Sequence, residues 1–248
     1  MSIKSTSELE ALKRIGRIVR LALDEMANAV RPGLTTEQLS DIGAQVLHGH
    51  GAHSAPPKVY GFPGAVCISI NHEAVHGVPS QKRLLKSGDL VKLDLVAEKD
   101  GFFADAAVTV KVGAVSQQAD ALVRCAEESF WEAIKVARAG NRLYEIGRAV
   151  ERHVRKSGFN VIKSLGGHGV GRTIHEEPSV PNYFDKTSKS KLKEGLVIAI
   201  EPIISAGSGY EKHEQDGWTI STADGSLSAH YEHTVVITPG EPILLTAN

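Results

Sequence analysis

The feature that most constrains the fold of this chain is a strand pattern that occurs once in each half. The segment LKSGDLVKLDL (85–95) aligns without a gap with LKEGLVIAIEP (192–202), and the alignment places Asp94 over Glu201. Helical hydrophobic spacing precedes both segments, and a further apolar strand pattern follows each of them. We therefore predict a duplicated α+β unit whose two halves are related by pseudo-twofold symmetry.

Hydrophobic periodicity and turn residues set the expected elements. They predict helices over about 8–30, 35–51, 117–139 and 142–157, a β-hairpin around 99–101, and strands within 194–204 and 230–239. No low-complexity segment or long linker separates these elements. We expect one catalytic domain over 1–248, with pseudo-repeat halves of about 1–115 and 116–248 and with helices outside an antiparallel sheet.

Acidic residues interrupt the apolar strands at matched positions. Successive side chains alternate between the faces of a strand, so Asp94 faces away from the leucines on both sides of it. A buried carboxylate costs several kcal/mol unless a positive charge compensates it. One such residue could face water at a sheet edge, but Asp105, Glu201 and Glu232 repeat the pattern. The sequence therefore predicts a shared centre that divalent cations neutralise.

A histidine between glycines is the candidate nitrogen ligand of that centre. His168 lies in LGGHGVGR, where the glycines allow backbone and substrate to approach closely. An imidazole ligand favours transition metals over magnesium. The same glycines could instead open a dinucleotide-binding G-x-G-x-x-G, but position 172 holds Arg172, and we set that interpretation aside.

The segment HEAVH (72–76) matches the H-E-x-x-H pattern of zinc proteases. That pattern requires a helix, on which two histidines bind zinc and the glutamate is the general base. Here a β-type run precedes the segment, and a glycine and a proline follow it within three residues. We therefore expect His76 to be functional, His72 to be a solvent-facing loop residue, and Glu73 not to be a general base.

Composition excludes several classes of function. With a net charge of −1, the chain lacks the basic surface typical of nucleic-acid-binding proteins. No apolar run approaches the roughly 20 residues needed to span a bilayer. Cys67 and Cys125 form no C-x-x-C motif, so we expect no disulfide framework. We expect a cytoplasmic monomer that does not bind membranes.

Five motifs resemble those of the type I methionine aminopeptidases, bacterial-type members of peptidase family M24 with the pita-bread fold. The motifs are NHEAVHGVP, LDLVAEKDGFFAD, GGHGVGRTIHEEP, IAIEP and DGWTISTADGSLSAHYEHT, and together they cover essentially the whole chain in the order of the family. The resemblance implies removal of the initiator methionine from nascent polypeptides when the second residue is small. Metal-activated water would attack the first peptide bond.

The resemblance also implies roles for individual residues. The metal ligands would be Asp94, Asp105, His168, Glu201 and Glu232, and they would hold two divalent ions: cobalt, manganese or iron(II), with zinc or nickel as further alternatives. Glu201 would in addition move a proton. His76 would contact the substrate near the scissile bond, and His175 would polarise the scissile carbonyl. The family role further implies association with the ribosome.

The expected methionine pocket both matches and departs from the family pattern. Phe62, Cys67 and Trp218 match pocket residues, whereas Pro56, Val59 and Ile174 stand where a cysteine and two aromatic residues are usual. The pocket remains apolar, but its shape and side-chain preference differ from those of well-known members.

Three alternative functions stay open: a prolidase or aminopeptidase P, a divergent paralogue with shifted specificity, and a pita-bread binding protein that has lost its metal.

Overall fold

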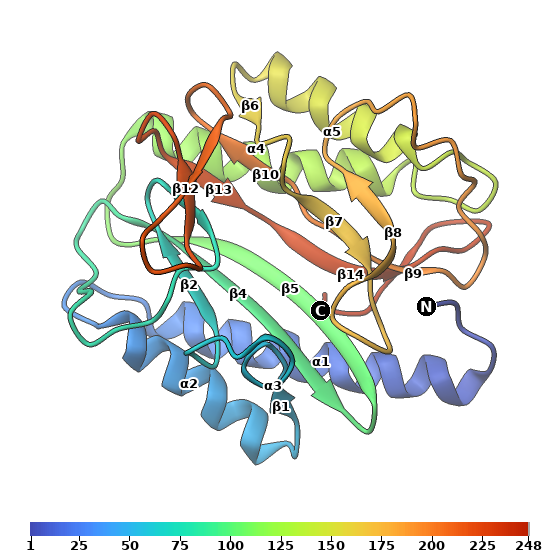
Figure 1. The fold of residues 1–248 in the computed structure, drawn as a ribbon, viewed down its shortest axis with the longest axis horizontal. Helices are drawn as coiled ribbons and strands as arrows, with labels where there is room; N and C mark the ends of the chain where they lie inside the picture. Colours follow the sequence, from blue (N-terminus) through green and yellow to red (C-terminus); the bar gives the residue numbers. More distant parts are fainter. Residues whose placement is uncertain (248) are drawn as a thin grey trace.

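The computed structural model describes residues 1–247, in which helices cover one side of a large β-sheet (Figure 1). The helices are Thr6–Ala29 (α1), Thr36–Gly49 (α2), Pro56–Tyr60 (α3), Gln117–Ile134 (α4) and Tyr144–Lys156 (α5). The strands are His53–Ser54 (β1), Cys67–Ile70 (β2), Glu73–Val75 (β3), Leu90–Lys99 (β4), Phe102–Lys111 (β5), Asn160–Val161 (β6), Gly166–Gly169 (β7), Glu176–Pro181 (β8), Val197–Ile200 (β9), Ile203–Ser205 (β10), Glu211–His213 (β11), Ile220–Thr222 (β12), Ser228–His230 (β13), Glu232–Val236 (β14) and Ile243–Leu244 (β15).

The main sheet joins the two halves of the chain. Its strand order is β1-β4-β5-β14-β9-β7-β8, with β2 also paired to β4 and β15 to β14. The order β4-β5-β14-β9 is symmetric about the central β5–β14 pair, where Glu232 lies opposite Ala107. Each strand that carries an acidic residue of the repeat therefore has a counterpart across this axis, as the repeat predicted.

The β4–β5 hairpin agrees with the sequence, whereas the second half departs from it. Asp100 and Gly101 both have positive φ in the predicted turn. In the second half β9 and β14 pair with each other, but about thirty residues separate them instead of a tight turn. The strand expected over 194–204 breaks after Ile200, where Pro202 cannot donate a ladder hydrogen bond. The strand expected over 230–239 breaks at Tyr231.

These two breaks place part of the chain in a second sheet. Strands β10 and β13 leave the main sheet and form a three-stranded sheet, of order β13-β10-β6. Residues 201 and 232 therefore lie where the chain passes from one sheet to the other. Strands β3, β11 and β12 form a third small sheet beside this crossing point (Figure 1). Glu201 and Glu232 therefore lie at this junction, whereas Asp94 and Asp105 lie within the ten-residue strands β4 and β5.

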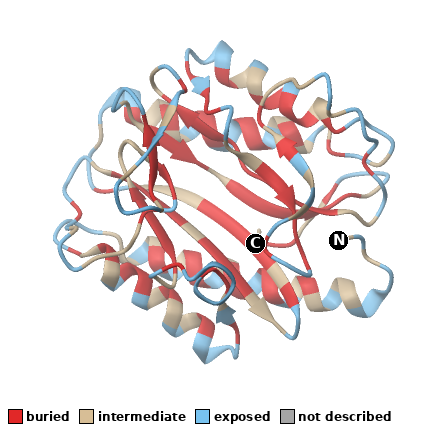
Figure 2. Cartoon of the chain, viewed as in Figure 1, coloured by how far each residue is buried: buried red, intermediate tan, exposed pale blue. Residues whose placement is uncertain are grey.

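The helices cover each half of the sheet separately. Helices α1 and α2 pack with β4 and β5 around one apolar core, and α4 and α5 pack with β9 and β14 around another. Their buried faces turn toward the sheet and their exposed faces away from it (Figure 2). A capping box at Thr35 and Gln38 begins α2 as expected.

Helix α4 is shorter than predicted. It ends at Ile134 and not at 139, because the amides of Ala139 and Gly140 donate to the carbonyls of Thr238 and Leu192. Cys67 and Cys125 are both free and buried. Within residues 1–247, no helix has the length and apolar character needed to cross a bilayer.

Candidate metal centre

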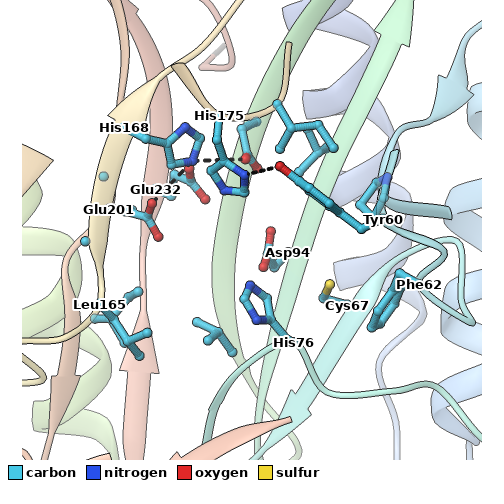
Figure 3. A pocket seen from close by; sticks show the side chains of 18 of the residues that line it. Tyr60, Phe62, Cys67, His76, Asp94, Leu165, His168, His175, Glu201 and Glu232 are labelled. Atoms are coloured by element: carbon cyan, nitrogen blue, oxygen red, sulfur yellow. Dashed lines mark hydrogen bonds and ion pairs between the residues drawn. The ribbon is translucent and has the colours of Figure 1, made fainter. Parts of the chain in front are cut away.

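Acidic side chains from both halves converge on one cavity of about 560 Å³. Asp94 comes from β4 and Asp105 from β5, Glu201 follows β9, Glu232 begins β14, and His168 comes from β7. The labelled members of this group point toward one another in Figure 3. The structure therefore brings together all five residues that the sequence singled out as metal ligands.

His168 is held in one orientation by its own strand. Its Nδ1 donates a hydrogen bond to the carbonyl of Gly169 at 2.9 Å, so the ring turns an unprotonated Nε2 toward the acidic residues. A Cβ at Gly167 would collide with the carbonyl oxygen of Ala199, and one at Gly169 with that of Glu177. The two glycines thus allow β7 to lie close to its neighbours, as the sequence suggested.

The distances within the centre are those of groups gathered around a charge. Nε2 of His168 lies 3.5 Å from Oε1 of Glu201 and 3.7 Å from Oδ2 of Asp105. Asp105 is only 4% exposed and Glu232 only 2% exposed. Burial, and then repulsion from neighbouring carboxylates, raises the pKa of each well above its ordinary value. Burial likewise raises the pKa of Glu201.

The donor set fits divalent cations. Within residues 1–247, Oδ1 of Asp105 and Oε1 of Glu232 are buried without any hydrogen-bond partner. A buried acceptor without a partner costs about 1–3 kcal/mol, and more when it is charged. Oxygen ligands with one imidazole are typical of transition-metal sites. A cation bound between the carboxylates would be coordinated by these two oxygens, and its positive charge would offset the repulsion among the carboxylates.

Two further histidines line the cavity beside this centre. His76 follows β3 with φ 58°, and His175 immediately precedes β8. The rings of His168 and His175 meet edge to face, with their centroids 4.3 Å apart. Burial lowers the pKa of both His76 and His175. A charge on His230 or His213 lowers the pKa of His76 further, and a charge on His76 lowers that of His175. Both are therefore neutral near pH 7.

The segment HEAVH is not a zinc-protease helix. Residues 73–75 form strand β3 and not a helix, in agreement with the residues that flank the segment. Glu73 forms an ion pair with Arg83 and accepts a hydrogen bond from the amide of Ile70 at 2.7 Å. His72 lines a separate surface cleft with Glu73. Glu73 thus has a structural role, whereas His76 lines the cavity beside the acidic residues.

An apolar pocket adjoins the centre. Phe62 and Trp218 meet edge to face with centroids 5.3 Å apart, and Cys67, Pro56 and Ile174 complete this wall of the cavity. Burial, and then the nearby charge of Asp94, raises the pKa of the Cys67 thiol well above its ordinary value. The pocket therefore presents a neutral, apolar surface.

Two residues of the cavity and centre were missed in the sequence. Tyr60, at the end of α3, lines the cavity, and its hydroxyl lies 2.6 Å from Nδ1 of His175. Val59, which we compared with a family aromatic residue, is instead 46% exposed. His230, at the end of β13, lies within 3.5 Å of both Glu201 and Glu232. Its spacing of two from Glu232 would put both on one face of the strand expected over 230–239, and this was a usable signal.

Comparison with known proteins gives a consistent assignment. The model of metallopeptidase family M24 matches residues 10–239. Methionine aminopeptidase 2 of Bacillus subtilis is 47% identical and a methionine aminopeptidase of Clostridium perfringens 42% identical, with alignments covering at least 98% of each chain.

Solved structures give the same result for the fold. Methionine aminopeptidase of Thermotoga maritima superposes with a TM-score of 0.97 over 100% of both chains, at 37% identity. The prolidase of Pyrococcus furiosus shares the fold at a TM-score of 0.79 and 23% identity, and the match covers only 65% of its chain. The protein has the pita-bread fold and belongs to metallopeptidase family M24, among its methionine aminopeptidases.

Proposed function

We propose that the protein removes N-terminal methionine from polypeptides whose second residue is small, and that residues 1–248 form one catalytic domain. The observation that carries this proposal is the convergence of four carboxylates and an imidazole beside an apolar pocket. Membership of family M24 and the methionine aminopeptidase relatives support it.

The proposed roles follow from position and protonation. Asp94, Asp105, His168, Glu201 and Glu232 would hold two divalent cations. Such ions lower the pKa of water and stabilise negative charge that develops on a carbonyl oxygen. Glu201 lines the cavity beside the other ligands, where its carboxylate would accept a proton from water and deliver it to the leaving amine.

The two neutral histidines and the apolar wall would position the substrate. A neutral His175 can donate a hydrogen bond to the developing oxyanion, while His76 contacts the peptide near the scissile bond. Phe62, Cys67 and Trp218 would surround the methionine side chain, because a thioether prefers an apolar and aromatic environment. A free amino terminus beside acidic groups would limit cleavage to the first residue.

The metal, the partner and the location belong to the same proposal. Cobalt, manganese or iron(II) suit an oxygen-rich site with imidazole, and zinc or nickel are further alternatives. We propose nascent polypeptide N-termini as the substrate, presented at the ribosome, and a monomeric enzyme that acts in the cytoplasm.

Peptide selectivity tests the proposed function. Protein reconstituted with cobalt or manganese is expected to release methionine from Met-Ala-X peptides and to leave Ala-Pro-X peptides intact. Chromatographic detection of the free amino acid in parallel reactions measures both. Cleavage of the X-Pro peptide alone would instead indicate a prolidase or an aminopeptidase P. Failure to cleave either peptide, despite bound metal, would contradict the proposal.

Tyr60 is expected to orient His175. Donation of the Tyr60 hydroxyl proton to Nδ1 leaves the imidazole proton on Nε2, where it can reach the substrate. Tyr60→Phe is expected to lower kcat on Met-Ala-X roughly tenfold, since partners that orient a functional histidine typically contribute about 10–100-fold. Val59→Ala, on the same helix but outside the cavity, is the matched control. Equal kcat values for both variants would contradict this role.

A further inference from the structure

The centre contains a sixth side chain with ligand chemistry, His230. It ends β13, is 1% exposed, and directs Nε2 toward two of the carboxylates. Nε2 lies 3.4 Å from Oε2 of Glu201 and 3.5 Å from Oε2 of Glu232. One ligand atom from each of these three residues lies within 4.8 Å of the other two, close enough for all three to bind one metal ion. A second such group consists of Asp105, His168 and Glu232.

Both ring nitrogens of His230 lack a hydrogen-bond partner within residues 1–247. The contrast with His233, which is buried close by, is informative. Nδ1 of His233 lies 2.9 Å from the hydroxyl of Thr246, and its Nε2 lies 3.2 Å from the hydroxyl of Tyr231. Buried polar groups are almost always paired. His233 is thus a satisfied core histidine, whereas His230 needs a partner that the described part of the chain does not supply.

The spacing around His230 identifies the kind of partner. Distances of 3.4 and 3.5 Å exceed the 2.7–3.2 Å range of N–H···O hydrogen bonds. Ligands about 2.1 Å from a shared tetrahedral ion lie roughly 3.4 Å from one another. Nε2 of His168 lies at a similar 3.5 Å from the other oxygen of Glu201. The Glu201 carboxylate therefore lies between two imidazoles, with one oxygen toward each.

We propose that Nε2 of His230 is a direct ligand of the metal centre, together with Glu201 and Glu232. The inference rests on the proposed metal-dependent function and adds to it a second nitrogen ligand. Each of the two ions would then have one imidazole, from His168 or from His230, and Glu232 would contribute to both groups. A second imidazole shifts the preference of the centre from magnesium and manganese toward cobalt, nickel and zinc.

Proton NMR of the cobalt(II)-loaded protein tests this ligand directly. An imidazole bound to cobalt gives a strongly shifted, solvent-exchangeable N–H signal, so the number of such signals counts the bound histidines. Wild type with two cobalt ions is expected to show two signals, and His230→Gln one. His213→Gln, a change at an exposed histidine of β11, is expected to retain both signals.

Calorimetric cobalt titration of the same proteins supplies the second measurement. His230→Gln is expected to weaken one cobalt site by at least about tenfold, because even indirect partners of a metal contribute about 10–100-fold. A single exchangeable signal in wild type, with cobalt affinity unchanged in His230→Gln, would overturn this inference and leave the proposed function intact. A wild-type protein that binds no cobalt would overturn the proposed function itself. The signal count in wild type does not depend on the folding of any variant.

Discussion

Replacing Asp105 with asparagine is expected to lower kcat/KM for Met-Ala-X peptides by at least about 10³-fold. Asp105 is almost fully buried, and its Oδ1 lacks a partner within residues 1–247. A bound cation contributes several kcal/mol of transition-state stabilisation, and each 1.36 kcal/mol corresponds to a factor of ten. Loss of one carboxylate removes both a ligand and part of the charge that attracts the cation.

The same substitution should stabilise the metal-free protein. Burial, and then repulsion from Asp94 and Glu201, raises the pKa of Asp105 well above its ordinary value. A group whose pKa is raised on folding contributes stability at low pH and loses that contribution as pH rises through its folded pKa. Metal-free Asp105→Asn is therefore expected to have a higher Tm than metal-free wild type near pH 8, with a smaller difference near pH 4.

Calorimetry and peptide assays on both metal-free and metal-loaded protein measure these effects. Asp120→Asn, which changes an exposed carboxylate paired with Lys111, is the control and is expected to retain activity. An active Asp105→Asn enzyme would remove Asp105 from the centre. A metal-free variant that is less stable than wild type would show that Asp105 is compensated by the protein alone.

Replacing His175 with alanine is expected to lower kcat by about 10²–10³-fold, the usual cost of removing one hydrogen-bond donor to an oxyanion. His175 lies beside His168 in the cavity, and burial lowers its pKa so that it acts as a neutral donor. His175 ligates nothing in the proposed centre, so the stability and metal affinity of the protein should stay close to wild type.

The split between activity and metal affinity distinguishes His175 from the ligands. Steady-state kinetics and cobalt titration on one preparation measure it, with His53→Ala, an exposed histidine of β1, as the control. An equal loss of metal affinity and activity in His175→Ala would indicate a structural role. Full activity would remove it from the mechanism.

The sequence predicted the fold where local and global patterns agree. Apolar periodicity marked four of the helices, and the turn at Asp100 and Gly101 marked the β4–β5 hairpin. The predicted element ends were wrong near Ile134 and Tyr231, where the chain takes hydrogen-bond partners distant in sequence although the apolar pattern continues. Such endings depend on partners distant in the chain, which periodicity does not report.

The candidate site was predictable to a similar extent. Acidic residues within apolar strands, matched between the two halves, marked four of the groups that converge in the cavity. His230 was missed although the strand expected over 230–239 would place it on the same face as Glu232. In the structure the chain breaks at Tyr231, and His230 belongs to β13 of the second sheet. Tyr60 was missed because the short helix α3, and so the direction of its side chains, left no periodic signal.

The most direct measurement of the central claim is a crystal structure of cobalt-loaded protein with anomalous scattering data at the cobalt edge. Two anomalous peaks are expected among Asp94, Asp105, Glu201 and Glu232, one adjoining His168 and one adjoining His230. No peak in that cavity, with the four carboxylates turned away from one another, would contradict the account.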